Sequence, residues 1–232
     1  MADAPIVQQI SGNGGGYQQS YSIVMPSNTT AGNCLVLFIS EQSQPEYTLT
    51  VSDSQDGIWT KVGNGSDLGV LFYRANISGG PLTITLDWGT DYQDFAFMVR
   101  EYSGLSSSPL DTFIEVNEVD WLNAHPIGPT SSPSQASTVV VAAYSGDANS
   151  TYTAEEEDGY SNLVSLNHSD LYGSMVYTDK EISSISQQTM TFSSTVYVKG
   201  YGIIAVFKKG ESGGDPDPSA YNNKAAFLAF FD

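Results

Sequence analysis

The chain has 232 residues and a formal net charge of −18, from 8 Lys and Arg against 26 Asp and Glu. So strong an acidic excess excludes nucleic acids and anionic membrane surfaces as partners, because both are bound through basic patches. The length is sufficient for one large all-β domain, or two small ones, with a sizeable core.

Short apolar runs rich in Val, Ile, Thr, Tyr and Phe alternate with clusters of Gly, Asn, Asp, Ser and Pro. This pattern is typical of strands and turns, and little of the chain has a helical period. In the first half we predict strands at 6–10, 17–25, 34–40, 47–52, 58–62, 68–74, 82–87 and 95–102. In the second half we predict strands at 112–116, 138–144, 151–155, 163–166, 172–177, 189–192 and 197–208.

The order of these runs occurs twice. A continuous apolar run at 35–39 leads through an acidic turn and two further strands to a closing strand at 95–102. A second continuous run, at 139–143, leads through the same order to a closing strand at 201–208. Repetition on this scale indicates related structural units, and continuous apolar runs predict strands buried on both faces. We therefore predict an all-β body of two related halves.

Two segments lack the alternation of a strand. Residues 117–135 include Pro126, Pro129 and Pro133, and we predict a long loop or crossover between the halves. The glycine-rich segment 12–16 is predicted to be a hairpin turn. It lacks the Gly-Lys-Ser/Thr ending that a phosphate-binding loop requires.

The C-terminal end has a different character from the body. Residues 210–219 are rich in Gly, Pro and Asp, which is typical of a linker. Residues 220–232 are apolar and aromatic, and exposure of such a segment to water favours aggregation. We therefore predict a body over 1–209, a linker over 210–219 and a partner-binding anchor over 220–232. Its candidate contact residues are Tyr221, Phe227, Leu228, Phe230 and Phe231.

Residues suited to catalysis are scarce. The two histidines, His125 and His168, are predicted to lie in exposed loops, and the single cysteine, Cys34, in a buried strand. The chain has no Gly-x-Ser-x-Gly motif, and one cysteine with two distant histidines does not suit zinc. We therefore predict that the protein is not an enzyme and has no cofactor, with calcium as the one open question.

Carboxylates gather at two turns. Asp53 and Asp56 belong to the first turn, and an acidic run at 155–159 occupies the equivalent place in the second half. Ca²⁺ takes several oxygen ligands from such loops, whereas Asp and Gly also serve turn geometry alone. The sequence leaves both explanations open, with Asp53 and Asp56 as the candidate calcium ligands.

Aromatic residues make up 12% of the chain, and exposed rings can stack on sugars. The candidates outside core-like strands are Trp59, Trp88 and Trp121. We expect Trp59 to be half-buried beside the acidic turn and Trp88 to be exposed at the end of its strand. The other aromatic positions mostly fit strand alternation, which predicts packing in a core.

Three local motifs follow one another in the first half: VSDSQDGIWT at 51–60, YRANISGGPLTIT at 73–85 and EYSGLSSSPLD at 101–111. Together they resemble a β-sandwich module of tailed-phage virion proteins and of bacterial secreted or surface proteins. The first motif departs from that pattern at Asp56-Gly57, where the module more often has Gly-Asn. The resemblance covers about 17–208 and implies an antiparallel, jelly-roll-like β-sandwich used for display, adhesion or assembly. It brings no catalytic residues.

The sequence before residue 6 has no basic region followed by an apolar stretch, so we expect no signal peptide and synthesis in the cytoplasm. No apolar run approaches the roughly 20 residues needed to span a bilayer. With the resemblance, this favours a structural protein of a phage particle, assembled in the host cytoplasm.

The specific hypothesis is a capsid decoration or cement protein. It would be a homo-oligomer held to other virion proteins by its C-terminal segment. The alternative is a glycan- or receptor-binding module of a tail fibre or secreted adhesin. A glycoside-processing enzyme on the same scaffold is a third interpretation.

Overall fold

The computed structural model describes residues 5–41, 49–89, 93–154, 159–168 and 173–210. Over these ranges the chain forms antiparallel strands and turns, which confirms the predicted all-β sandwich. None of these residues belongs to a helix long and apolar enough to cross a membrane.

The described residues of the first half form eight strands. They are β1 (Ile6–Gln18), β2 (Ser20–Val24), β3 (Cys34–Glu41), β4 (Thr50–Asp53), β5 (Thr60–Ser66), β6 (Gly69–Arg74), β7 (Thr83–Asp87) and β8 (Gln93–Tyr102). The strands form a larger sheet in the order β1-β8-β3-β6-β5 and a smaller sheet in the order β2-β7-β4. The two sheets enclose an apolar core that includes Leu37, Ile84 and Phe95.

In the second half, the part of the chain that the structure describes forms six strands, of which two are long. They are β9 (Leu105–Ile127), β10 (Thr138–Gly146), β11 (Tyr152–Ala154), β12 (Ser161–Asn167), β13 (Ser174–Ile182) and β14 (Met190–Lys209). The sheet order is β11-β14-β10-β13-β12, and β9 also pairs with β14. The first residues of β14 pair with the end of β9 and with β11, whereas its later residues pair with β10 and the rest of β9. The bent sheet encloses a second core that includes Tyr144, Tyr152 and Phe192.

The two halves have the same strand order. The order β9-β14-β10-β13-β12 matches β1-β8-β3-β6-β5, and the end of β9, the start of β14 and β11 match β2-β7-β4. The long strands β9 and β14 each take the place of two strands of the first half. Each half is therefore a jelly-roll-like sandwich, and the repeat in the sequence corresponds to a repeat of the whole fold.

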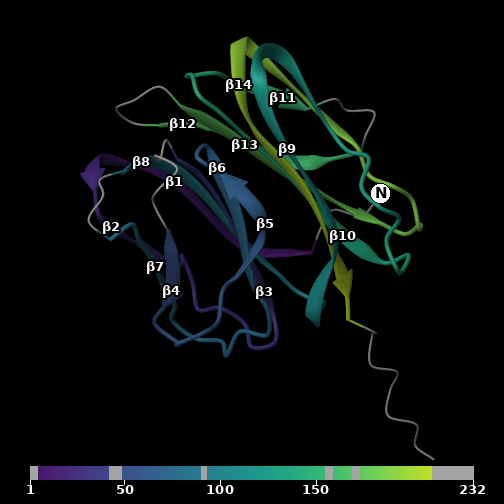
Figure 1. The fold of residues 1–232 in the computed structure, drawn as a ribbon. Coiled ribbons are helices and arrows are strands. Elements are labelled where there is room, and N and C mark those ends of the chain that lie inside the picture. The colour runs from purple at the N-terminus through teal and green to yellow at the C-terminus, as the bar shows by residue number, and fades with distance from the viewer. Residues whose placement is uncertain (1–4, 42–48, 90–92, 155–158, 169–172, 211–232) are drawn as a thin grey trace, which may run out of the picture.

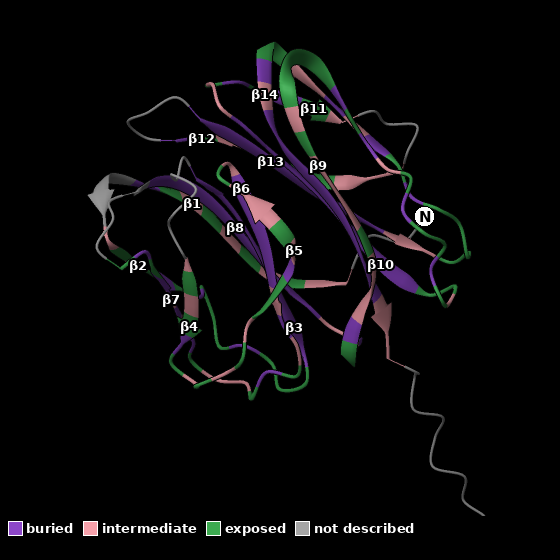
Figure 2. Cartoon of the chain, viewed as in Figure 1, coloured by how far each residue is buried: buried purple, intermediate pink, exposed green. Residues whose placement is uncertain are grey.

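The two larger sheets pack face to face (Figure 1), and Figure 2 shows them as the most deeply buried strands. β3 lies against β10, β8 against β13, β6 against β14, β1 against β12, and β5 against β9. The contacts occur in equivalent pairs: β8 packs on β13, and their counterparts β14 and β6 pack on each other. This is the arrangement that a two-fold axis between the halves produces. Ser40 in β3 and Ser145 in β10 meet near that axis, with their Oγ atoms 2.6 Å apart. The halves therefore pack like the two subunits of a symmetric dimer.

The central position of β3 and β10 follows from their composition. Both strands are buried at every residue, as their continuous apolar runs predict. Alternate side chains point to opposite faces of a strand. In β3, Val36 and Phe38 face the core between the halves, while Leu35 and Leu37 face the core of the first half.

Two sequence predictions about connections are wrong. Residues 12–16 lie inside β1, where 12–14 pair with β8, and form no hairpin turn. Gly14 is needed there because a Cβ atom would lie 2.3 Å from the ring of Phe95, so that the missing side chain leaves room for the aromatic ring. Residues 117–127 belong to β9, which pairs with β14, so the rest of the expected loop joins β9 to β10 within the second half and does not connect the halves.

Candidate functional site

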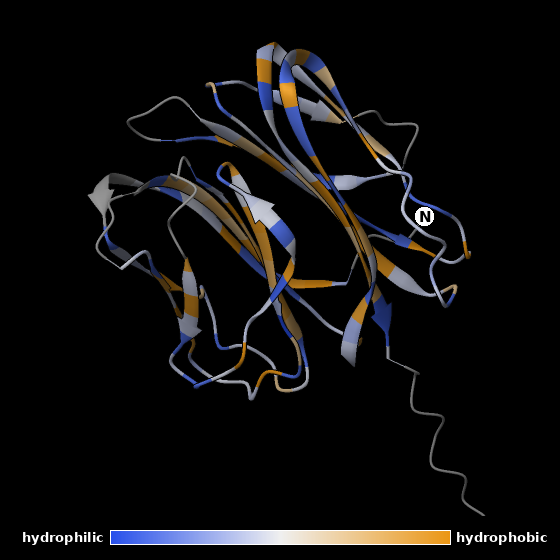
Figure 3. Cartoon of the chain, in the orientation of Figure 1, coloured by the Kyte–Doolittle hydropathy of each residue, from blue (hydrophilic) through white to orange (hydrophobic). Residues whose placement is uncertain are grey.

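The bend of β9 and β14 forms a ribbon at the top of Figure 1. Much of this ribbon is exposed in the colouring of Figure 2, and Figure 3 shows hydrophobic positions along it. The exposed fractions are 81% for Val119, 56% for Trp121, 38% for Leu122, 43% for Val196 and 64% for Tyr197. We call these five residues the crest. Single exposed apolar residues are common on protein surfaces, so it is the grouping of these five on one ribbon that makes the crest a candidate interaction site.

The ribbon exists because the two strands lose their register. Ser193 pairs with Ala124 and Val198 pairs with Leu122, so residues 194–197 of β14 oppose a single residue of β9. Extra residues of this kind bend a strand and redirect its side chains. As a result, residues 119–124 and 195–197 are all exposed.

The imidazole of His125 stabilises the base of the ribbon, where Glu118, His125 and Ser194 meet; we call these three residues the root. Its Nδ1 lies 2.6 Å from Glu118 Oε2, and its Nε2 lies 2.9 Å from Ser194 Oγ. The ring stacks on Tyr144 at a centroid distance of 4.2 Å, and the Tyr144 hydroxyl donates to the same Glu118 oxygen at 2.7 Å. These contacts join both ends of the exposed part of β9 to β14 and to β10.

The expected exposure of His125 is wrong, because its side chain is fully buried. β9 continues through this residue and pairs it with Phe192, which turns the imidazole toward the core of the second half. The sequence signal was available in the alternation of His125 with Ile127, both of which are buried. The three proline residues nearby concealed it, because they favour a loop.

Ser194, His125 and Glu118 are connected in the same way as a Ser-His-acid catalytic triad. In such a triad the serine hydroxyl donates to the histidine. Here the Ser194 hydroxyl donates to the carbonyl oxygen of Val196 at 2.7 Å. The arrangement therefore fixes the bend of β14 and does not present a prepared nucleophile.

Trp121 is the most exposed of the three tryptophans. Lys199 Nζ lies 5.9 Å from the centroid of its ring, within cation–π range, and 3.8 Å from a carboxylate oxygen of Asp147. The indole therefore contacts the Lys199 ammonium on one side, while more than half of its surface stays exposed to solvent.

The expected exposure of Trp88 is wrong, since only 2% of it is exposed. The alternation of β7 continues past its end, so Trp88 joins Ile84 in the core of the first half. Its Nε1–H donates to Glu41 Oε2 at 2.5 Å, and its ring packs on Phe95. Burial raises the pKa of Glu41 to about 7.

The carboxylate of Asp53 is buried and already has partners. Arg74 Nη1 lies 2.5 Å from one oxygen, and the same oxygen accepts a hydrogen bond from Trp59 Nε1 at 2.7 Å. The other oxygen accepts from the backbone N–H of Gln55 at 2.8 Å. Trp59 is half-buried in this contact, as expected. A calcium ion at Asp53 would have to displace a guanidinium.

Asp56 lies at the turn with a left-handed φ of 53°, the conformation that turn residues supply. In the described part of the chain, no three Asp, Glu, His or Cys side chains are grouped so as to hold a metal ion. Residues 155–158 of the second acidic turn lie outside the described residues. The predicted anchor residues also lie outside them, namely Tyr221, Phe227, Leu228, Phe230 and Phe231.

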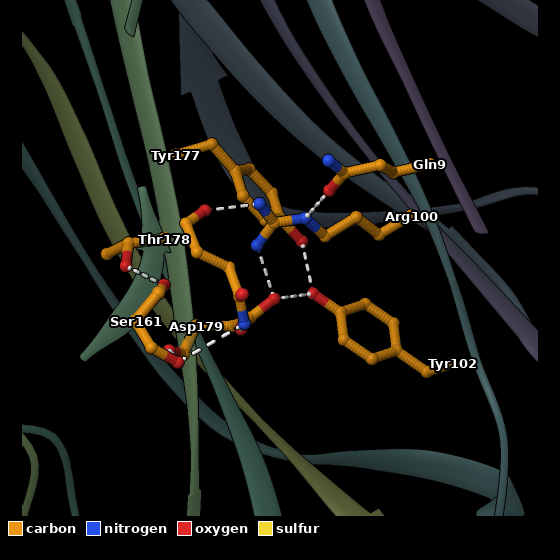
Figure 4. Close-up of polar contacts among 8 residues, drawn as sticks. Gln9, Arg100, Tyr102, Ser161, Tyr177, Thr178 and Asp179 are labelled. Atoms are coloured by element: carbon orange, nitrogen blue, oxygen red, sulfur yellow. Dashed lines mark hydrogen bonds and ion pairs between the residues drawn. The ribbon is translucent and has the colours of Figure 1, made fainter. Parts of the chain in front are cut away.

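A second polar cluster lies between the two larger sheets (Figure 4). Arg100 of β8 forms a buried ion pair with Asp179 of β13, and the Tyr102 hydroxyl donates to the same carboxylate at 2.5 Å. Arg100 Nε also donates to Gln9 Oε1 at 2.9 Å, and Nη2 donates to the carbonyl of Asn162. Sequence analysis missed this cluster, although a charge within an otherwise apolar strand is a detectable signal.

His168 is buried as well, so its expected exposure is also wrong. Its Nε2 lies 2.8 Å from Ser40 Oγ, beside the contact between Ser40 and Ser145. Burial lowers the pKa of His168 to about 4, which keeps the ring neutral near pH 7. Cys34 is buried as predicted, and burial raises the pKa of its thiol, so it does not form a reactive thiolate.

No protein-family model matches the chain, and neither the curated proteins nor the solved structures contain a match to it. The resemblance to phage and bacterial surface modules therefore stays a prediction from three short motifs.

Proposed function

We propose that the protein is a non-enzymatic structural protein that attaches to a larger assembly through the crest, and specifically a capsid decoration or cement protein of a phage particle. The observation that carries this proposal is the exposure of Trp121, Tyr197 and three aliphatic side chains on one supported ribbon. Trp and Tyr supply much of the binding energy in protein interfaces.

The root of the ribbon favours tight binding. His125 is buried between Glu118 and Tyr144, so the strand that carries Trp121 is held before any partner arrives. A surface that is already ordered loses less conformational entropy on binding than a flexible one. Apolar area buried in the complex contributes about 25 cal/mol per Å² before the costs of association.

Charge indicates the chemistry of the partner. The net charge of −18 attracts a basic surface and repels an acidic one. We therefore assign as partner a protein surface with an apolar depression for Trp121 and Tyr197 and a basic rim around it. Jelly rolls are frequent in viral capsid proteins, which supports the phage assignment by analogy of fold alone.

The C-terminal segment 220–232 would provide a second attachment. Two linked attachments can exceed the affinity of either by about 10²–10⁴ when both are engaged together. In this proposal the crest sets the orientation of the body, and the anchor holds the chain on the particle.

A glycan- or receptor-binding module is the second candidate, and one observation favours it. The Trp121 ring is exposed beside the polar side chains of Lys199 and Asp147. Sugars stack on aromatic faces and take hydrogen bonds from neighbouring polar groups.

The test is co-sedimentation of the purified chain with particles assembled without it. Trp121→Ala and Tyr197→Ala should each weaken binding about thirtyfold, the effect of losing about 2 kcal/mol at a hot spot. Ile58→Ala is the matched control, because Ile58 is 86% exposed and lies just before β5 in the first half, whereas the ribbon belongs to the second half. Wild-type binding by both crest variants would refute the crest as the attachment site. Retention on a glycan array that is lost in Trp121→Ala, without binding to particles, would establish the second candidate instead.

A further inference from the structure

The hydrogen bonds around His125 determine how many protons its ring carries. Glu118 Oε2 lies 2.6 Å from Nδ1 and already accepts the hydroxyl hydrogen of Tyr144. An ionised carboxylate has no hydrogen to give, so the hydrogen in the contact with Nδ1 belongs to the imidazole.

The other ring nitrogen can be assigned in the same way. Ser194 has one hydroxyl hydrogen, and that hydrogen is directed to the carbonyl oxygen of Val196, which can only accept. The contact of 2.9 Å between Ser194 Oγ and His125 Nε2 then needs a hydrogen on Nε2. A hydrogen on both nitrogens would make His125 an imidazolium paired with the Glu118 carboxylate.

The surroundings agree with a buried cation at this place. Tyr144 stacks on the ring, and the edge of Tyr152 faces it at a centroid distance of 6.2 Å. Burial raises the pKa of both tyrosines, so each stays a neutral hydrogen-bond donor. Two further charged groups lie near the root, Asp147 directly after β10 and Lys199 of β14, and they face one another at 3.8 Å.

We propose that His125 is a buried imidazolium that acts as a proton-dependent latch for the crest. The Nε2–H of the charged ring donates to Ser194 Oγ. The Ser194 hydroxyl hydrogen can then donate to the carbonyl oxygen of Val196, which stabilises the bend. Loss of the Nε2 hydrogen turns that nitrogen into an acceptor. The Ser194 hydroxyl must then rotate toward the ring and release Val196, which is itself a crest residue.

The latch predicts that the crest is ordered when His125 is charged and loosens as the pH rises. The charge state itself does not depend on the function proposed above. Only the consequence for partner binding rests on that function, namely that affinity for the particle falls as the ring loses its proton. The two steps can therefore fail separately.

The test is a nitrogen-detected NMR titration of the imidazole rings in the full chain. The sequence has two histidines, and His168 provides the internal control, because burial keeps that ring neutral down to about pH 4. We expect His125 to show two protonated nitrogens at pH 6 and His168 to show one, with assignments from His168→Gln. A neutral His125 at pH 6 would overturn the proposal.

Two variants test the latch mechanism. Ser194→Ala removes the acceptor of the Nε2 hydrogen, so the midpoint of the His125 titration should move to lower pH than in the wild type, because the charged ring loses one hydrogen bond. Ser193→Ala, one residue earlier, is the matched control and should leave the midpoint unchanged. The amide signals of Val196 and Tyr197 should shift with the wild-type midpoint. Crest signals that ignore the titration, or labelling of Ser194 by a fluorophosphonate as in a true triad, would overturn the proposal.

Discussion

Arg100 of the first half and Asp179 of the second half form an ion pair that is almost fully withdrawn from water, with 1% and 0% of their side chains exposed. The pair lies between the two sheets that form the central core. Tyr102 and Tyr177 surround it, and the Arg100 guanidinium lies 4.8 Å from the centroid of the Tyr177 ring. A pair in this position allows only one alignment of the halves, because any sliding separates the two charges.

Removal of one partner of this pair should be strongly destabilising. Asp179→Ala leaves the guanidinium buried without its counter-ion, and we expect a loss of about 3–5 kcal/mol in the free energy of unfolding, measured with urea. The double change Arg100→Met with Asp179→Leu should recover much of that loss. The control is Glu181→Ala, which breaks a more exposed pair with Lys209 and should cost under about 1 kcal/mol. Equal losses for the two single variants would show that burial does not govern the energetics of the pair.

Glu41 should make the fold less stable as the pH rises. Burial raises its pKa from the ordinary 4.5 to about 7, so the folded state binds a proton that the unfolded state releases. Stability from this group is therefore full below about pH 4.5 and is lost as the pH approaches and passes 7. Glu41→Gln keeps a carbonyl acceptor for Trp88 and should raise the melting temperature at pH 8 but not at pH 4. A lower melting temperature at pH 8 would show that the carboxylate is stabilising.

His168 should have the opposite pH dependence. Burial lowers its pKa from 6.5 to about 4, so between these pH values the unfolded state binds a proton that the folded state does not bind. The stability that it contributes is present above about pH 6.5 and is lost as the pH falls toward 4. In His168→Gln this part of the acid sensitivity should disappear from thermal unfolding curves between pH 6.5 and 4. An unchanged slope in that interval would mean that other groups cause the acid sensitivity.

Gly14 should not tolerate a side chain. A Cβ atom there would lie 2.3 Å from the Phe95 ring, so Gly14→Ala forces the ring or the strand to move, at a cost of about 1–3 kcal/mol. Gly12→Ala, at 3.2 Å from Phe97 in the same strand, is the matched variant and should be milder. Chemical denaturation of both variants measures the difference. Indistinguishable curves would mean that β1 adjusts without strain.

Asp53 should stabilise the fold by pairing with Arg74 whether or not calcium is present. Asp53→Asn should lower the melting temperature by the same amount in EDTA and in millimolar calcium, because the loss is that of a buried ion pair. A calcium ion bound to the folded state alone would add about 2.7 kcal/mol at a hundredfold excess over its dissociation constant. If calcium stabilises the wild type and not Asp53→Asn, the turn is a metal site after all.

The fold could be predicted from the sequence where local pattern and tertiary burial agree. The continuous runs that became β3 and β10 are apolar on both faces, and the structure places a core on each side of both strands. The prediction failed where a long-range contact overrides a local signal. Gly12 and Gly14 indicate a turn, but the aromatic rings of β8 use the space of their missing side chains.

The candidate site was only partly predictable for the same reason. Trp121 was among the candidates for ligand contact, whereas Tyr197 belonged to a predicted strand and drew no attention. Exposure of Tyr197 depends on the broken register between β9 and β14, which no local pattern encodes. His125 required knowledge of Glu118 and Ser194, and the serine lies 69 residues away in sequence.

The face-to-face packing of the halves has a consequence for biosynthesis. The sheet that contains β3 and β8 is finished before β10, β13 and β14 have been made, so its inner face has nothing to cover it on the ribosome. Arg100 waits for Asp179, which is 79 residues later. At about 5–20 residues per second, the exposed interval is roughly 4–16 s. Over that time the nascent first half exposes an apolar sheet face, together with the Arg100 charge that the complete fold buries. A chaperone that binds this face, or slow release from the ribosome, should therefore affect the yield of folded protein. The effect should be larger than for a chain in which each repeat folds independently as it is synthesised.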